Sequence, residues 1–224
     1  MRHTDIAIVG GGLAGSAAAA MLGRAGIDAV LIDPHDVYPF DFRCEKLDIK
    51  QQALVQKTGL ADVLFPVTTP NSGVWTARMT RLIEKRVNNQ RDIYYDTIVN
   101  AARAAIPKSV PLLVGKVTSI TATSDRQSLT LSDGKEISAR LVVLAIGLNN
   151  ALRQSLGIER EIISACHSVS VGFDMVPVGR SRFPFPALDY YPERPSDRIS
   201  YLTLFPIGSG MRANLFTYRD AHDP

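Results

Sequence analysis

Apolar residues in the first part of the chain gather in short runs that are separated by turns. Residues 6–9 form the first run, residues 16–22 are rich in alanine, and residues 29–32 form a second run that ends in Asp33. Short continuous apolar runs indicate strands covered on both faces, and the alanine-rich stretch between them favours a helix. The pattern therefore predicts a strand, a helix and a second, parallel strand.

Two later stretches carry apolar positions at helical spacing. The chain is expected to lead through residues 43–45 into a helix that ends near Gly59, and its core-facing positions would be Leu47, Leu54 and Val55. A second helix is expected from about Asp96, because Ile98, Val99, Ala102 and Ile106 repeat on one face. Between them, residues 66–92 alternate in short runs broken by proline and glycine, which predicts strands.

Residues 112–144 alternate between apolar and polar positions, with turn residues at 124–126 and 132–134. An Asp-Gly pair between two alternating runs favours a hairpin, so this stretch predicts an antiparallel meander. Residues 141–146 are apolar throughout, as a strand covered on both faces must be. A short helix is expected at 149–156.

The last third of the chain alternates again, in residues 168–175, 201–205 and 213–218. A turn is expected at 208–210, and six prolines lie from Pro177 to Pro206. These features predict an antiparallel sheet with a long proline-rich loop.

Together these patterns predict an α/β fold with two interleaved domains. The first is a Rossmann-type domain with a parallel sheet and a β-meander, covering residues 1–70 and 95–165. The second is a smaller β-rich domain, covering residues 71–94 and 166–224.

Composition fits a soluble globular protein, with 46% hydrophobic and 21% charged residues. The formal charge of +3, with no dense basic block beyond residues 78–86, argues against nucleic acid or an anionic membrane surface as a partner. No stretch is long enough to span a membrane. Cys44 and Cys166 form no C-x-x-C motif, so we expect a reducing cytoplasm and two small buried side chains. The four scattered histidines predict no metal site.

Three glycines between the first strand and helix carry the clearest chemistry. Gly10 allows a tight turn, Gly12 lets a pyrophosphate approach the backbone, and Gly15 lets the helix pack closely on the strand. Asp33, at the end of the second strand, is placed to accept hydrogen bonds from a ribose. The acid favours FAD or NAD over NADP. A βαβ unit that binds nothing is the alternative, and a P-loop is excluded because Ser16 stands where its lysine is needed.

Two further sets of residues leave the function open. Arg43, just before the second helix, is either a nucleotide contact or a surface ion-pair partner. The aromatic residues of the proline-rich loop either line an apolar pocket or pack locally, and they are Phe183, Phe185, Tyr190 and Tyr191.

The order of elements resembles the group A flavoprotein monooxygenases, the aromatic-hydroxylase type. Residues 5–33 are similar to the family's first FAD motif, and residues 145–153 to its second, Ala-Asp-Gly followed by serine and arginine. The resemblance implies that FAD is bound by Gly10, Gly11, Gly12, Leu13, Ala14, Gly15, Asp33, Pro34, Arg43, Val117 and Gly147. Ile146 replaces the second motif's aspartate, Asn150 its serine, and Tyr95 stands where the family often has an arginine.

The resemblance also implies an activity. The expected reaction is hydroxylation of an apolar or aromatic small molecule, with NADPH or NADH as electron donor and O₂ as oxidant. A reductase or halogenase of the same fold is an alternative, although no Trp-x-Trp-x-Ile-Pro halogenase signature occurs near Trp75. A non-catalytic dinucleotide-binding module is another, because the family's third motif, a Gly-Asp pair, is absent from this sequence. We therefore expect a fragment or truncated homologue with an incomplete substrate domain.

Overall fold

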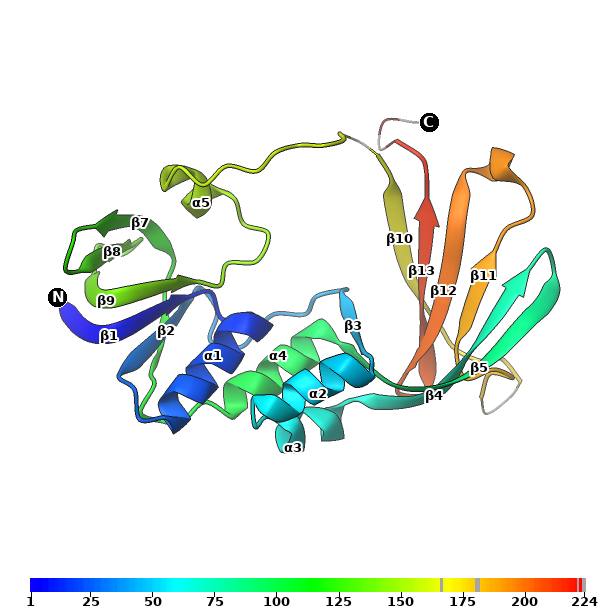
Figure 1. Cartoon of the computed structure of the whole chain (residues 1–224), viewed down its shortest axis with the longest axis horizontal. Helices are drawn as coiled ribbons and strands as arrows, with labels where there is room; N and C mark the ends of the chain where they lie inside the picture. The colour runs from blue at the N-terminus through cyan, green and yellow to red at the C-terminus, as the bar shows by residue number, and fades with distance from the viewer. Residues whose placement is uncertain (166, 180–181, 221, 223–224) are drawn as a thin grey trace. The chain divides into compact units, whose positions relative to one another are not determined.

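The computed structural model describes residues 1–165, 167–179, 182–220 and 222, and its chain divides into two compact units (Figure 1). The first unit comprises Met1–Asp41, Leu54–Val67 and Tyr95–Arg160. The second comprises Phe42–Ala53, Thr68–Tyr94 and Glu161–Pro224. Each unit contains one sheet and its own apolar clusters.

The first unit is built on a six-stranded sheet in the order β6-β2-β1-β9-β8-β7. Its strands are β1 (Arg2–Val9), β2 (Ala29–Asp33), β6 (Leu112–Val114), β7 (Val117–Ala122), β8 (Gln127–Leu131) and β9 (Glu136–Leu144). β1 pairs in parallel with β2 and β9, and β2 pairs in parallel with β6. β7, β8 and β9 form the expected antiparallel meander.

Helices accompany this sheet. They are α1 (Leu13–Arg24), α3 (Ala61–Leu64), α4 (Tyr95–Ala104), α5 (Ala151–Ser155) and the 3₁₀ turn η1 (Phe65–Val67). Alternate residues of β1 serve two cores: Ile8 packs with Ala19 of α1, whereas Ala7 and Val9 pack with the meander and with Leu152 of α5. Successive side chains of β1 therefore alternate between two apolar layers, as expected of a strand covered on both faces.

The second unit is a seven-stranded sheet in the order β10-β13-β12-β11-β4-β5-β3. Its strands are β3 (Cys44–Leu47), β4 (Thr69–Arg78), β5 (Arg81–Tyr94), β10 (Val169–Met175), β11 (Leu188–Tyr191), β12 (Ile199–Ile207) and β13 (Gly210–Thr217). A 3₁₀ turn, η2 (Pro195–Asp197), precedes β12, and the expected turn at 208–210 joins β12 to β13. Figure 1 shows β10 to β13 side by side.

Several expectations about local structure are wrong. Residues 44–47 form strand β3 instead of helix, because they pair antiparallel with Arg91–Tyr94 of β5. The helix that follows is α2 (Ile49–Lys57), where Leu54, expected in the core, is 59% exposed. Leu141 in the strand expected to be covered on both faces is 50% exposed. Strand β11, inside the proline-rich loop, was not expected.

The pairing of β3 with β5 also moves a domain boundary. The sequence placed residues 1–70 in one domain, whereas Phe42–Ala53 group with the second unit in the structure. The chain therefore enters the second unit three times. Among the described residues, no helix has both the length and the hydropathy needed to span a bilayer.

Candidate functional site

The glycine turn joins β1 to α1 by direct backbone packing. Gly10 has a φ of +103°, and its N–H donates to the Ile32 carbonyl at 2.8 Å. A Cβ atom at Gly15 would lie 1.9 Å from the Gly10 carbonyl oxygen, and one at Gly10 would lie 2.5 Å from the carbonyl oxygen of Ala145. Side chains are therefore excluded at Gly10 and Gly15, as the motif predicts.

The N-terminus of α1 presents backbone N–H donors, and no acidic residue lies in its first turn. Gly12 is the N-cap residue, and its backbone is extended. It makes no side-chain capping hydrogen bond to the helix. The Leu13 N–H donates to the hydroxyl of Tyr95 at 3.2 Å, so the residue that replaces the family's arginine reaches this helix end. Leu13 and Ala14 begin the first turn, where the helix dipole favours a negative group. This is the place where the sequence puts a pyrophosphate.

Asp33 is buried at the end of β2, with a side chain that is 9% exposed. Its Oδ2 accepts the Gly11 N–H at 2.7 Å, and its Oδ1 accepts the His35 N–H at 2.9 Å. Arg103 of α4 also reaches it, with Nη2 at 3.0 Å from Oδ1. The sequence did not single out Arg103, because an arginine in the last turn of an amphipathic helix has the pattern of an exposed residue.

A hollow of about 220 Å³ lies beside Asp33. Its lining comes from β1, β2, β7, α5 and the turns between them: Val9, Gly10, Ile32, Asp33, Pro34, Gly115, Lys116, Val117, Ile146, Asn149 and Leu152. The structure thus brings Pro34 and Val117 together with the glycine turn. Ile146, which replaces an aspartate of the second motif, gives this hollow an apolar wall.

Two of the expected cofactor contacts, Arg43 and Gly147, are not among the residues that line this hollow. Gly147 follows β9 with a φ of +58°, and its carbonyl accepts from Arg153 at 3.0 Å. Arg153 also donates to the Asn150 side chain at 3.0 Å, so these two residues of the second motif contact each other. Arg43 belongs to the second unit, and its Nε lies 3.6 Å from Oε1 of Glu45. The roles of Arg43 and Gly147 in binding stay predictions.

The second unit carries an ion pair between a buried arginine and a half-exposed aspartate on one face of its sheet. The Arg212 side chain is 1% exposed and reaches Asp174 at 2.5 and 2.9 Å. Its guanidinium also donates to the Phe42 carbonyl and stacks on the Phe42 ring, with 3.6 Å to the centroid. The centroid of the Tyr94 ring lies 4.8 Å from Cζ of Arg212. Arg212 therefore ties β13 to β10 and to the segment before β3.

Beside this pair lies a hollow of about 240 Å³ with mixed chemistry, and its lining residues are Phe42, Arg43, Cys44, Ser170, Gly172, Asn214 and Phe216. Two aromatic rings meet a hydroxyl, an amide and a guanidinium there. Burial raises the pKa of the Cys44 thiol, which lies within hydrogen-bond reach of Asn214. Cys44 is half-buried on β3, and Cys166 lies outside the described residues. The described residues hold no cluster of His, Cys, Asp and Glu that fits a metal ion.

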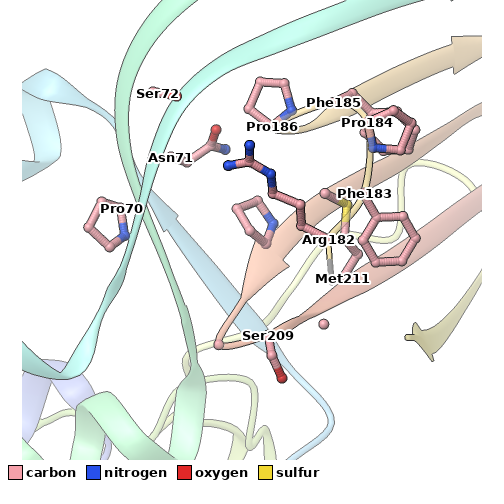
Figure 2. Close-up of a pocket in the computed structure, with 13 residues that line it drawn as sticks. Pro70, Asn71, Ser72, Arg182, Phe183, Pro184, Phe185, Pro186, Ser209 and Met211 are labelled. Carbon is pink, nitrogen blue, oxygen red and sulfur yellow. The ribbon is translucent and has the colours of Figure 1, made fainter. Parts of the chain in front are cut away.

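A larger groove, of about 690 Å³, opens on the other face of this sheet (Figure 2). Phe183 and Phe185 line it with four prolines and Met211, while Figure 2 shows Arg182 extending toward Asn71. Tyr190 and Tyr191, expected with the two phenylalanines, are not among its lining residues. Tyr191 instead packs on Tyr201, with ring centroids 5.9 Å apart.

Comparison with known proteins agrees with the geometry of the first unit. The sequence profile described as "FAD binding domain" matches residues 3–222. Over 176 residues the chain is 28% identical to "Ubiquinone hydroxylase UbiL" of Rhodospirillum rubrum, a match that covers 69% of this chain and 39% of that protein.

Solved structures share the fold. The p-nitrophenol 4-monooxygenase PnpA of Pseudomonas putida superposes with a TM-score of 0.83 at 15% identity, covering 100% of this chain and 60% of that one. PqsL of Pseudomonas aeruginosa, described as a probable FAD-dependent monooxygenase, gives 0.76 at 18% identity, covering 98% and 61%. The chain thus spans about three-fifths of the solved relatives' length.

These matches confirm the resemblance to the group A flavoproteins and FAD as the cofactor. The residues present fit that cofactor. The glycine turn exposes backbone without side chains, and it is flanked by the α1 N-terminus, by Asp33 and by the hollow beside Asp33. The chain belongs to the FAD-binding domain family.

Proposed function

We propose that this protein is a monooxygenase that uses NADPH or NADH and O₂ to hydroxylate an apolar or aromatic small molecule. In this proposal, the first unit holds the adenosine and pyrophosphate of FAD, and the second unit binds the substrate. The observation that carries the substrate assignment is the hollow between Phe42 and Phe216, which combines two rings with polar groups.

Each proposed FAD contact has a physical reason. The Ala14 N–H at the start of α1 suits the negative pyrophosphate, whereas the Leu13 N–H already donates to the Tyr95 hydroxyl. The Asp33 carboxylate suits the donor hydroxyls of a ribose, and Pro34 and Val117 offer an apolar wall for the base. Tyr95 brings a hydroxyl to the same helix end.

The proposed substrate hollow favours a flat molecule with one polar substituent. Phe42 and Phe216 supply apolar surface, and small binding sites are mostly apolar with a few placed polar groups. Ser170 and Asn214 each offer a donor and an acceptor, which suit a phenolic hydroxyl or a nitro group. Their strands are fixed by the pair of Arg212 with Asp174, which spans β13 and β10.

The proposed reaction balances as substrate C–H, O₂, NAD(P)H and H⁺ giving substrate C–OH, NAD(P)⁺ and water. When bound, FAD supplies the two-electron chemistry that links oxidation of the nicotinamide to insertion of one oxygen atom. The protein residues named above bind and orient the substrate. This division of work accounts for the lack of an acid–base constellation among the described residues.

The test is a coupled measurement on the FAD-loaded protein with a panel of phenolic and heteroaromatic compounds. NAD(P)H oxidation, O₂ uptake and incorporation of isotopically labelled O₂ into product are recorded together. Asn214→Ala is expected to raise the KM of an accepted substrate by about tenfold, the value of one hydrogen bond to a polar substituent. Asn89→Ala, an exposed asparagine of the same unit, is the matched control and should leave KM unchanged.

Other outcomes separate the alternatives. Reduction of an alkene without O₂ uptake would favour a reductase, and halide-dependent product formation would favour a halogenase. Bound FAD that neither NADH nor NADPH reduces, whatever compound is present, would favour a non-catalytic nucleotide-binding module. In each of these cases the hydroxylase proposal is abandoned.

A further inference from the structure

Arg103 is the last-turn arginine of α4, yet its guanidinium lies inside the first unit. Its side chain is only 7% exposed. Nε donates to the Gly11 carbonyl at 2.9 Å, and Nη1 donates to the carbonyls of His35 and Asp36 at 2.6 and 2.8 Å. One side chain therefore connects the glycine turn to the segment that follows β2.

The third nitrogen of Arg103 faces Asp33. Nη2 lies 3.0 Å from Oδ1 of Asp33, which makes an ion pair, but Nη2 forms no hydrogen bond of good geometry with any described residue. A buried donor left in this way costs free energy. A ribose hydroxyl can donate to a carboxylate and accept from a neighbouring N–H, so a nucleotide bound at Asp33 satisfies both groups.

Arg103 also explains the middle glycine of the turn. A Cβ atom at Gly11 would lie 2.6 Å from Nη2 of Arg103 and 3.1 Å from Cβ of Asp33. The guanidinium thus occupies the volume that a side chain at position 11 would take. Gly11, Asp33 and Arg103 therefore form one packed group.

We propose that Arg103 is a positioning residue of the FAD site. It holds the Asp33 carboxylate and the Gly11 peptide in the arrangement that receives the adenosine ribose and the pyrophosphate. Its guanidinium makes four contacts at once, three with backbone carbonyls and one with the Asp33 carboxylate, which a lysine ammonium cannot reproduce. The inference rests on the proposed placement of FAD at Asp33.

The test measures binding of ADP, FAD and riboflavin to the 224-residue chain by titration calorimetry. Arg103→Gln is expected to weaken ADP and FAD binding by at least about tenfold, with little recovery in Arg103→Lys. Any riboflavin binding should not change, because riboflavin lacks the adenosine end. Arg24→Gln is the matched control: it removes a cation of the same unit that donates to the Gly59 carbonyl, and it should leave ADP affinity within about twofold.

A double-mutant cycle distinguishes positioning from general stabilisation. If Arg103 acts through Asp33, the combined Arg103→Gln and Asp33→Asn variant binds ADP about as weakly as the weaker single variant. Independent effects, whose fold-losses multiply, would overturn the inference. So would an Arg103→Gln protein with the ADP affinity of the wild type.

A measurement of unfolding tests the packing of Arg103 even in variants that bind no ligand. Gly11→Ala is expected to lower the unfolding midpoint of the ligand-free chain, and to do so much less in an Arg103→Ser background, where the crowded nitrogen is gone. An equal loss in both backgrounds contradicts the proposed packing. If the wild-type chain binds neither ADP nor FAD, the placement of the FAD site fails and this inference fails with it. If the wild type binds and Arg103→Gln binds equally, only the inference fails.

Discussion

Asp92 is a buried carboxylate whose removal should stabilise the second unit at neutral pH. It lies on β5 and is 0% exposed. Asn71 donates to its Oδ2 at 2.9 Å and Gln90 to its Oδ1 at 2.6 Å, and Lys46 is its partner in the β3–β5 ladder. Burial raises the pKa of Asp92 from 3.8 to about 6, although these hydrogen bonds and the lysine charge oppose the rise.

The sign and size follow from proton linkage. The folded protein binds the Asp92 proton more tightly than the unfolded chain, so the stability linked to this group is fully present below the unfolded pKa of 3.8 and is lost as pH rises through about 6. A rise of one in pKa corresponds to about 1.4 kcal/mol, so the loss amounts to roughly 3 kcal/mol. Asp92→Asn removes the charge but keeps only one acceptor for two donors, which costs about 1 kcal/mol. We expect a net gain of about 2 kcal/mol at pH about 8.

Urea unfolding followed by tryptophan fluorescence measures this directly. Trp75 is the single tryptophan of the chain and lies on β4, next to β5, so its emission reports on the second unit. Wild type and Asp92→Asn are compared at pH about 8 and about 4.5, where the linked loss is mostly absent. Asp197→Asn, which changes an exposed carboxylate of the same unit, is the control. A stability difference between wild type and Asp92→Asn that is the same at both pH values would refute the reasoning.

Three further predictions concern binding and stability. Asp33→Asn should weaken FAD binding by about 1.5 to 3 kcal/mol, the range for a hydrogen bond to a charged group, and calorimetry with FAD checks it. Gly12→Val should weaken FAD binding more than Asp33→Asn, because the side chain blocks the approach of the pyrophosphate. The variant should still fold, because a Cβ atom at position 12 meets only the Tyr95 hydroxyl, at 3.1 Å. Calorimetry and circular dichroism on one sample test both statements. Arg212→Met should destabilise the second unit by about 2 to 3 kcal/mol, because it removes bonds to Asp174 and the Phe42 carbonyl, and Trp75 fluorescence in urea should show this loss to exceed that of Asp174→Asn.

The elements around the glycine turn were predictable because their signals are local. Gly10, Gly15 and Asp33 follow from a strand, a turn and a helix that are adjacent in sequence, and the meander follows from its Asp-Gly turn. Residues 44–47 were misread because helix-forming residues there pair as a strand only through contact with β5. Local composition does not contain that partner.

The site itself was predicted only in part, for a similar reason. Arg103 is separated from Gly11 by 92 residues, and its burial depends on the packing of α4 against the glycine turn. The amphipathic pattern of α4 identified its apolar face, but an arginine at the edge of that face gives no sign of turning inward. Tyr95 reached the helix end in the same way, across 82 residues.

The route of the chain limits how this protein can be rebuilt. Since the second unit takes Phe42–Ala53, Thr68–Tyr94 and the residues from Glu161 onward, neither unit is a continuous piece of the gene. A chimaera that exchanges the sheet of the second unit with that of a relative must therefore replace three segments at once. β3 and β5 must come from the same parent, because they pair with each other. Specificity engineering by simple fragment exchange would divide strands from their partners, whereas substitution of individual side chains in the hollows leaves every pairing intact.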